Sequence, residues 1–132
     1  MPETSPLNVL VIDDEEAHAS LVSRVFKKNG HDVAVVNSAE DGLANFKGGD
    51  FDLVITDIFM KGMGGIAGID SIRASNPDVM IIAMSAGYSD MSAGEALAKA
   101  REVGADAVLP KPFPLADLMI TVSGLLENRQ SG

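Results

Sequence analysis

Phe51-Asp52-Leu53-Val54-Ile55-Thr56-Asp57 is the stretch that decides the fold. Its centre, Leu53 to Ile55, is an apolar run with β-branched members that is too short for a helix. Such a run is typical of a strand covered on both faces, as in a parallel sheet. It ends in a lone acid, Asp57, which a glycine-rich segment follows. Because open α/β sheets bind ligands at the carboxyl ends of their strands, Asp57 is the candidate reactive group.

Strands and helices are expected to alternate on both sides of this stretch. The other predicted strands are Asn8 to Ile12, Asp32 to Val36, Val79 to Met84 and Ala107 to Leu109. Helices are predicted near Glu16 to Asn29, Ala39 to Lys47, Ile66 to Ser75, from the cap Ser92 to about Val103, and from Pro114 or Leu115 onward. Five alternations predict an α/β fold, a parallel sheet with helices on both faces and right-handed crossovers.

Apolar spacing predicts which helix faces are buried. In the first helix Ala17, Leu21 and Val25 lie four apart and are expected to face the core, with Val22 and Phe26 beside them. The inward residues expected in the third and last helices are Ile66, Ile69, Ile72, Leu118, Val122 and Leu125. Ser38 is expected to cap the second helix. His18 and His31 have no ligand-like spacing, and we interpret both as surface residues.

Length and composition limit the possible classes of protein. A chain of 132 residues is expected to form one domain, 1–132, with a core at about 7–127 and short tails. The apolar runs are too short to span a bilayer, and the N-terminus does not resemble a signal peptide. There is no cysteine, which fits a reducing compartment, so the expected location is cytoplasmic and no membrane partner is expected. The net charge of −9 and the lack of a basic patch argue against nucleic acid binding.

Polar side chains follow four of the predicted strands. Asp13 and Asp14 come after the first strand, Asp57 ends the third, Ser85 follows the fourth and Lys111 follows the fifth. In a parallel sheet these ends share one edge, so the side chains can converge. Each residue alone could be a turn, cap or loop residue, but their ordered placement favours a site.

The predicted site favours a metal and a phosphoryl group. Three carboxylates held close together repel one another unless a cation is present, and Mg²⁺ prefers oxygen ligands. A carboxylate can be the nucleophile in phosphoryl transfer, which forms an aspartyl phosphate. The metal and Lys111 would offset the charge on the phosphoryl oxygens, and the Ser85 hydroxyl would bind one of them.

The sequence resembles the receiver domain of bacterial two-component response regulators. The matching pieces are Val11-Ile12-Asp13-Asp14-Glu15, Asp52 to Asp57, Met60 with Gly62 and Gly65, Ser85-Ala86, Gly104-Ala105-Asp106 and Lys111-Pro112-Phe113. The resemblance extends from about Leu7 to Leu126. It implies a flavodoxin-like three-layer sandwich whose five-stranded parallel sheet has the order 2-1-3-4-5, with five helices.

The resemblance also implies roles for the site residues. Asp57 is the implied phosphoacceptor, and Ser85 and Lys111 contact the phosphoryl group. The implied ligands of Mg²⁺ are Asp13, Asp14, Asp57 and the backbone carbonyl of Phe59. The Lys111-Pro112 bond is expected to be cis.

The partners that the resemblance implies are a sensor histidine kinase or a histidine phosphotransfer protein as donor, and a downstream protein target. Phosphorylation is expected to alter the fourth helix, fifth strand and fifth helix, which face the target. The chain is expected to be a monomer or a weak phosphorylation-dependent dimer, and to catalyse only its own phosphorylation and dephosphorylation. Val108 stands where a switch tyrosine or phenylalanine is common, and our hypothesis is that Tyr88 partly takes that role or that the output surface differs.

Two alternatives belong to other classes. A haloacid-dehalogenase-like phosphatase also works through an aspartyl phosphate, but its nucleophile lies in an Asp-x-Asp motif after the first strand, whereas Asp13 and Asp14 are adjacent. A flavodoxin needs hydroxyls and amides in its first phosphate loop, and the acids from Asp13 to Glu16 would repel a phosphate there.

Overall fold

The computed structural model describes residues 6–48, 50–58, 65–85, 93–111 and 113–131. Five strands and five helices alternate along this part of the chain. Their bounds are β1 Asn8–Ile12, α1 Glu16–Lys28, β2 Asp32–Val36, α2 Ala39–Gly48, β3 Leu53–Asp57, α3 Gly65–Ser75, β4 Met80–Ser85, α4 Ala93–Val103, β5 Ala107–Pro110 and α5 Leu115–Ser131. The predicted elements are confirmed, with bounds that match for β1 and β2 and differ by one or two residues elsewhere. No helix in these ranges is both long and apolar enough to cross a bilayer.

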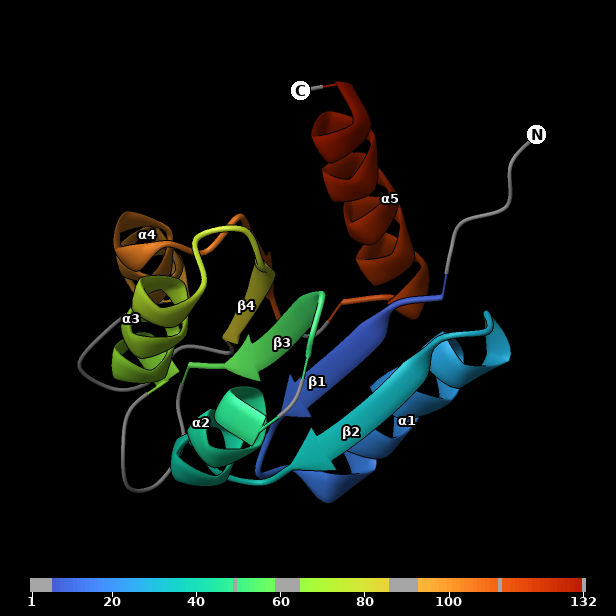
Figure 1. Cartoon of the computed structure of the whole chain (residues 1–132), viewed down its shortest axis with the longest axis horizontal. Helices are drawn as coiled ribbons and strands as arrows, with labels where there is room; N and C mark the ends of the chain where they lie inside the picture. Colours follow the sequence, from blue (N-terminus) through green and yellow to red (C-terminus); the bar gives the residue numbers. More distant parts are fainter. Residues whose placement is uncertain (1–5, 49, 59–64, 86–92, 112, 132) are drawn as a thin grey trace.

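The strands form one parallel sheet in the order β2-β1-β3-β4-β5, as expected. Figure 1 shows α1 and α5 on one face and α2, α3 and α4 on the other. Strand residues alternate between the two layers: Val9 and Val11 pack with α1 and α5, whereas Leu10 and Ile12 pack with the other helices. Alternate side chains point to opposite faces of a strand, so both faces of a covered strand must be apolar.

The central strand β3 is buried along its whole length, as the opening stretch predicts. Leu53, Val54 and Ile55 are fully buried between β1 and β4. Each such side chain contributes about 1.5–3 kcal/mol through removal of apolar surface from water. Asp57 therefore stands at the end of a strand that is paired on both sides and covered on both faces.

The predicted inner face of α1 is partly wrong. The residues that the helix buries are Ala19, Val22, Ser23 and Phe26, whereas Ala17 and Leu21 are exposed. The buried face is rotated relative to the predicted one: Val22 and Phe26 lie at its centre, and Leu21 and Val25 lie at its margin. The cap of α2 is confirmed, because Ser38 Oγ accepts a hydrogen bond from the Asp41 N–H at 3.1 Å; the predicted cap Ser92 lies outside the described residues. The other predicted faces agree better: Ile69, Ile72, Leu118 and Val122 are buried, and Ile66 and Leu125 are partly buried against the core.

Arg73, at the end of α3, ties two loops together at the sheet edge opposite the carboxyl ends. Its guanidinium donates to the backbone carbonyls of Pro77 and Val79 at 2.7 Å each and to that of Gly104 at 2.9 and 3.2 Å. It also pairs with Asp106 at 2.7 Å. Gly104 has a φ of +129°, and a Cβ there would lie 2.9 Å from Arg73 Cγ, so this position requires glycine.

Arg73→Met is expected to lower the free energy of unfolding by about 2–4 kcal/mol, because it leaves several carbonyls without their charged donor. Urea unfolding measures the change. Arg24→Met, an exposed change on α1, serves as the control and is expected to alter stability by at most about 0.5 kcal/mol. Equal stability of the two variants would contradict the role given to Arg73.

His31 is buried, so its interpretation as a surface residue is wrong. Its Nδ1 accepts a hydrogen bond from the Leu7 N–H at 3.0 Å, and its ring packs on Phe26 with centroids 5.8 Å apart. An accepting Nδ1 carries no proton, so the ring is neutral in the folded state. Burial lowers the pKa of His31 below its ordinary value.

Stability is therefore expected to fall as the pH drops through the ordinary histidine pKa of 6.5, because the unfolded chain then binds a proton that the folded chain excludes. His31→Asn keeps an acceptor near the position of Nδ1 but does not titrate. Urea unfolding between about pH 7.5 and about pH 5 is expected to show a larger loss in the wild type than in His31→Asn. Parallel losses would rule out His31 as the cause.

Candidate functional site

The sheet brings the predicted site residues to one edge. Asp57 is the last residue of β3, Ser85 is the last of β4, and Asp13 and Lys111 directly follow β1 and β5. Backbone hydrogen bonds extend the sheet to these positions, from the Asp13 N–H to the Val36 carbonyl at 3.1 Å and from the Lys111 N–H to the Ser85 carbonyl at 2.8 Å. The expected convergence is confirmed for Asp13, Asp57 and Lys111, whose side chains are in contact, and Ser85 ends its strand at the same edge.

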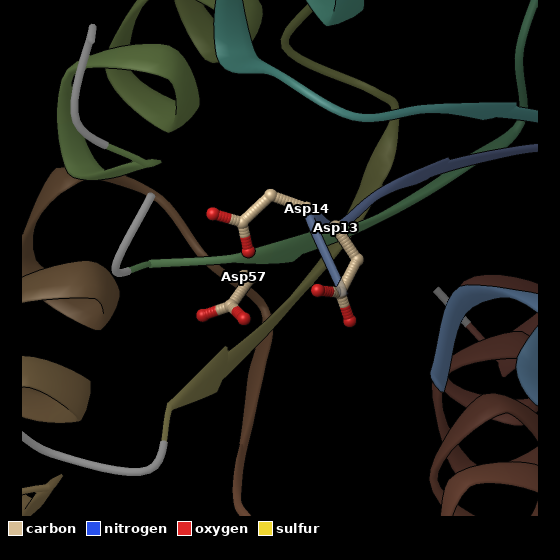
Figure 2. A group of neighbouring side chains, drawn as sticks. All are labelled: Asp13, Asp14 and Asp57. Carbon is tan, nitrogen blue, oxygen red and sulfur yellow. The ribbon is translucent and has the colours of Figure 1, made fainter. Parts of the chain in front are cut away.

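Three carboxylates meet at this edge. Asp13, Asp14 and Asp57 each offer an oxygen within 4.8 Å of the others. Figure 2 shows the carboxylate of Asp57 flanked by those of the two adjacent acids, which leave the chain in different directions. Asp13 and Asp57 are buried, and Asp14 is exposed. One side of the cluster is thus closed by protein and the other is open to solvent.

Lys111 places a positive charge among these acids. Its Nζ lies 2.8 Å from Asp57 Oδ2, 3.2 Å from Glu15 Oε1 and 3.3 Å from Asp13 Oδ2. Burial acts to lower the pKa of Lys111, but the hydrogen bond to Asp57 and the charges of Asp57 and Asp13 outweigh it, so the pKa is raised. The ammonium group stays charged and offsets the repulsion between the acids.

Asp13 is held by donors on both of its oxygens. The Glu15 N–H donates to Oδ1 at 2.9 Å, and His18 Nδ1 and Lys111 Nζ reach Oδ2 at 2.8 and 3.3 Å. His18 and Glu15 are site neighbours that the sequence analysis missed. Asp13 precedes α1 and His18 lies inside it, so no helical spacing rule links them. His18 is half-buried, with 22% of its side chain exposed, and interpreting it as a surface residue overlooked this contact.

Ser85 is fully buried at the end of β4. Met84, the residue before it, pairs with Asp57 in the sheet, so Ser85 lies one step further along the edge that carries the acids. Val108, the residue at the position of the switch aromatic, pairs with Ala83 and packs with the layer of α2, α3 and α4. The predictions made for Phe59, Met60, Gly62, Tyr88 and Pro112 fall outside the described residues.

The donor set fits a hard divalent cation. All three side chains of the cluster offer carboxylate oxygens, two of them from positions fixed by strand ends. Oxygen ligands of this kind suit Mg²⁺, which keeps several waters and binds few carboxylates. Among the described residues, no histidine or cysteine belongs to the cluster, so the set does not favour zinc.

Comparison with known proteins gives the family. A model of the response regulator receiver domain matches residues 9–123. The transcriptional regulatory protein ZraR of Salmonella typhimurium is 35% identical over 127 residues, which are 96% of this chain and 28% of that protein. The DNA-binding transcriptional regulator NtrC of Azospirillum brasilense is 34% identical over 94% of this chain and 25% of its own length. The chain thus spans about a quarter of these relatives.

Solved structures agree with the fold. A CheY-like receiver domain protein from Methanospirillum hungatei gives a TM-score of 0.86 at 24% identity and covers 96% of this chain and 98% of its own. A Francisella receiver domain gives a TM-score of 0.81 at 28% identity and covers 93% of this chain and 98% of its own. Both structures are receiver domains, so these matches support neither the phosphatase alternative nor the flavodoxin alternative. The chain belongs to the response regulator receiver domain family.

Proposed function

We propose that this receiver domain is a phosphoryl-accepting switch in which Asp57 is the acceptor. The observation that supports this best is the placement of Asp57 on the central strand, with a second buried acid, Asp13, and the Lys111 ammonium beside it. The donor is a phosphohistidine on a sensor histidine kinase or a phosphotransfer protein. A downstream protein target recognises the phosphorylated domain.

In the transfer, an oxygen of the ionised Asp57 attacks the phosphorus atom. An O–P bond forms, the P–N bond to the donor imidazole breaks, and the electron pair stays on that nitrogen, which then takes a proton from water. Lys111 already contacts Asp57 Oδ2 and offsets negative charge on the phosphoryl oxygens. Ser85 supplies a hydroxyl at the same edge.

Mg²⁺ is the cofactor that we propose. Asp13, Asp14 and Asp57 would hold it, together with the backbone carbonyl of Phe59, which the family resemblance supplies. The ion would add positive charge next to the phosphoryl oxygens. Asp13 is oriented for this role by contacts to both of its oxygens, from the Glu15 N–H to Oδ1 and from His18 Nδ1 to Oδ2.

The output is proposed to be a change in the face formed by α4, β5 and α5, as in the family. The net charge of −9 supports a protein target rather than direct contact of this domain with nucleic acid. A monomer or a weak dimer formed on phosphorylation, in the cytoplasm, fits this proposal.

Acetyl phosphate labelling tests the function. The wild type is expected to gain one phosphoryl group per chain in Mg²⁺ and none in excess EDTA, as intact-protein mass spectrometry would show. Repeated turnover of p-nitrophenyl phosphate would instead support the haloacid-dehalogenase-like alternative, and equal labelling in EDTA would contradict the metal requirement.

A further inference from the structure

His18 links the acidic cluster to the segment after β5. Its Nδ1 lies 2.8 Å from Asp13 Oδ2, and its ring meets the ring of Phe113 edge-on, with centroids 5.5 Å apart and an interplanar angle of 83°. Asp13 Oδ1 accepts from the Glu15 N–H and Oδ2 accepts from Lys111 Nζ, so the arrangement favours the His18 tautomer in which Nδ1 carries the proton and donates to Oδ2. The ring is therefore oriented on one side by the acid and on the other by Phe113.

Asp13 Oδ2 has two side-chain donors among the described residues, His18 and Lys111, and Lys111 also contacts Asp57. Lys111 is 3.3 Å from this oxygen but 2.8 Å from Asp57 Oδ2. A phosphoryl group on Asp57 draws the ammonium toward its own oxygens. The Asp13 side chain has no exposed surface, so water cannot readily replace a lost donor.

We propose that His18 is a positioning residue that holds Asp13 in the orientation of a metal ligand. Its Nδ1–H is the nearer donor to Oδ2 already in the unphosphorylated protein, at 2.8 Å against 3.3 Å for Lys111, and it remains when Lys111 turns to the phosphoryl group. Phe113 keeps the ring in place. Hydrogen bonds of this kind to a metal ligand commonly contribute a factor of 10–100 in metal affinity. This inference rests on the proposed function, because it takes Asp13 as a ligand of Mg²⁺.

Three variants separate the donor from the ring. His18→Phe keeps a ring against Phe113 and removes the donor. His18→Asn keeps a donor near the position of Nδ1 and removes the ring. Leu21→Ala, an exposed change on the same helix, controls for helix stability.

Titration calorimetry with MgCl₂ on the unphosphorylated protein is the readout, and urea unfolding in EDTA reports stability separately. His18→Phe is expected to weaken Mg²⁺ binding by about 10- to 100-fold, whereas His18→Asn and Leu21→Ala stay within about threefold of the wild type. Wild-type affinity in His18→Phe would overturn the inference, and so would equal weakening in His18→Phe and His18→Asn.

Nitrogen NMR of the wild type covers the case in which a variant fails to fold. The Nδ1 of His18 is expected to be protonated both without and with Mg²⁺, and an unprotonated Nδ1 would overturn the inference. If the wild type itself neither bound Mg²⁺ nor labelled with acetyl phosphate, the proposed function would fail instead. The NMR result would still report on the contact between His18 and Asp13.

Discussion

Asp57→Asn is expected to take up no detectable phosphoryl group from acetyl phosphate in Mg²⁺, a loss of at least about a thousandfold. The amide has nearly the shape of the carboxylate but is a poor nucleophile, so the change removes the reaction and not the site. Intact-protein mass spectrometry at fixed times measures the labelled fraction.

The fold of Asp57→Asn is expected to survive. The substitution removes one negative charge from a cluster in which Asp13 and Asp14 lie within 4.8 Å, so repulsion between the acids falls. Asp70→Asn, an exposed change on α3, is the matched control and is expected to label like the wild type. Undiminished labelling of Asp57→Asn would show that the phosphoryl group goes elsewhere.

Lys111→Met is expected to have the second largest effect, on both reaction and stability. Removal of a preorganised positive charge next to the reacting oxygen is expected to slow labelling by about 10²- to 10³-fold. In the metal-free protein the change leaves buried acids without their cation, which is expected to cost about 3–5 kcal/mol of unfolding free energy. The short contact from Nζ to Asp57 and the small exposure of both side chains support these magnitudes.

Mg²⁺ is expected to restore part of this lost stability, because the ion binds the folded state and supplies the missing charge. Urea unfolding of Lys111→Met with EDTA or with MgCl₂ measures the difference. Lys27→Met, an exposed change in the last turn of α1, is the control. A Lys111→Met protein as stable as this control in EDTA would contradict the electrostatic role of Lys111.

The order of elements and the edge that carries the site could be predicted because they depend on local pattern. The apolar run from Leu53 to Ile55 and the acid at its end define a buried strand and its reactive terminus. The same pattern of strands predicts that Asp13, Ser85 and Lys111 lie at the carboxyl ends of neighbouring strands. Parallel strands share a carboxyl edge, so proximity followed from the topology.

The missed features all depend on tertiary contacts. Arg73 donates to backbone carbonyls, which every residue has, so nothing in the sequence marks its partners. His31 accepts from the Leu7 N–H, 24 residues away, and His18 reaches back from a helix to an acid that precedes it. The α1 face was misjudged because Leu21 is apolar yet exposed, and Ser23 is polar yet buried.

The proposed function requires that acids from two strand ends hold one divalent ion beside Asp57. A crystal structure of the wild type grown with Mn²⁺, which takes the oxygen sites of Mg²⁺, tests it directly through anomalous scattering. We expect a single anomalous peak about 2 Å from a carboxylate oxygen of Asp57 and from one of Asp13 or Asp14. A peak elsewhere on the protein, or one that Asp57 does not ligate, would rule out this metal site.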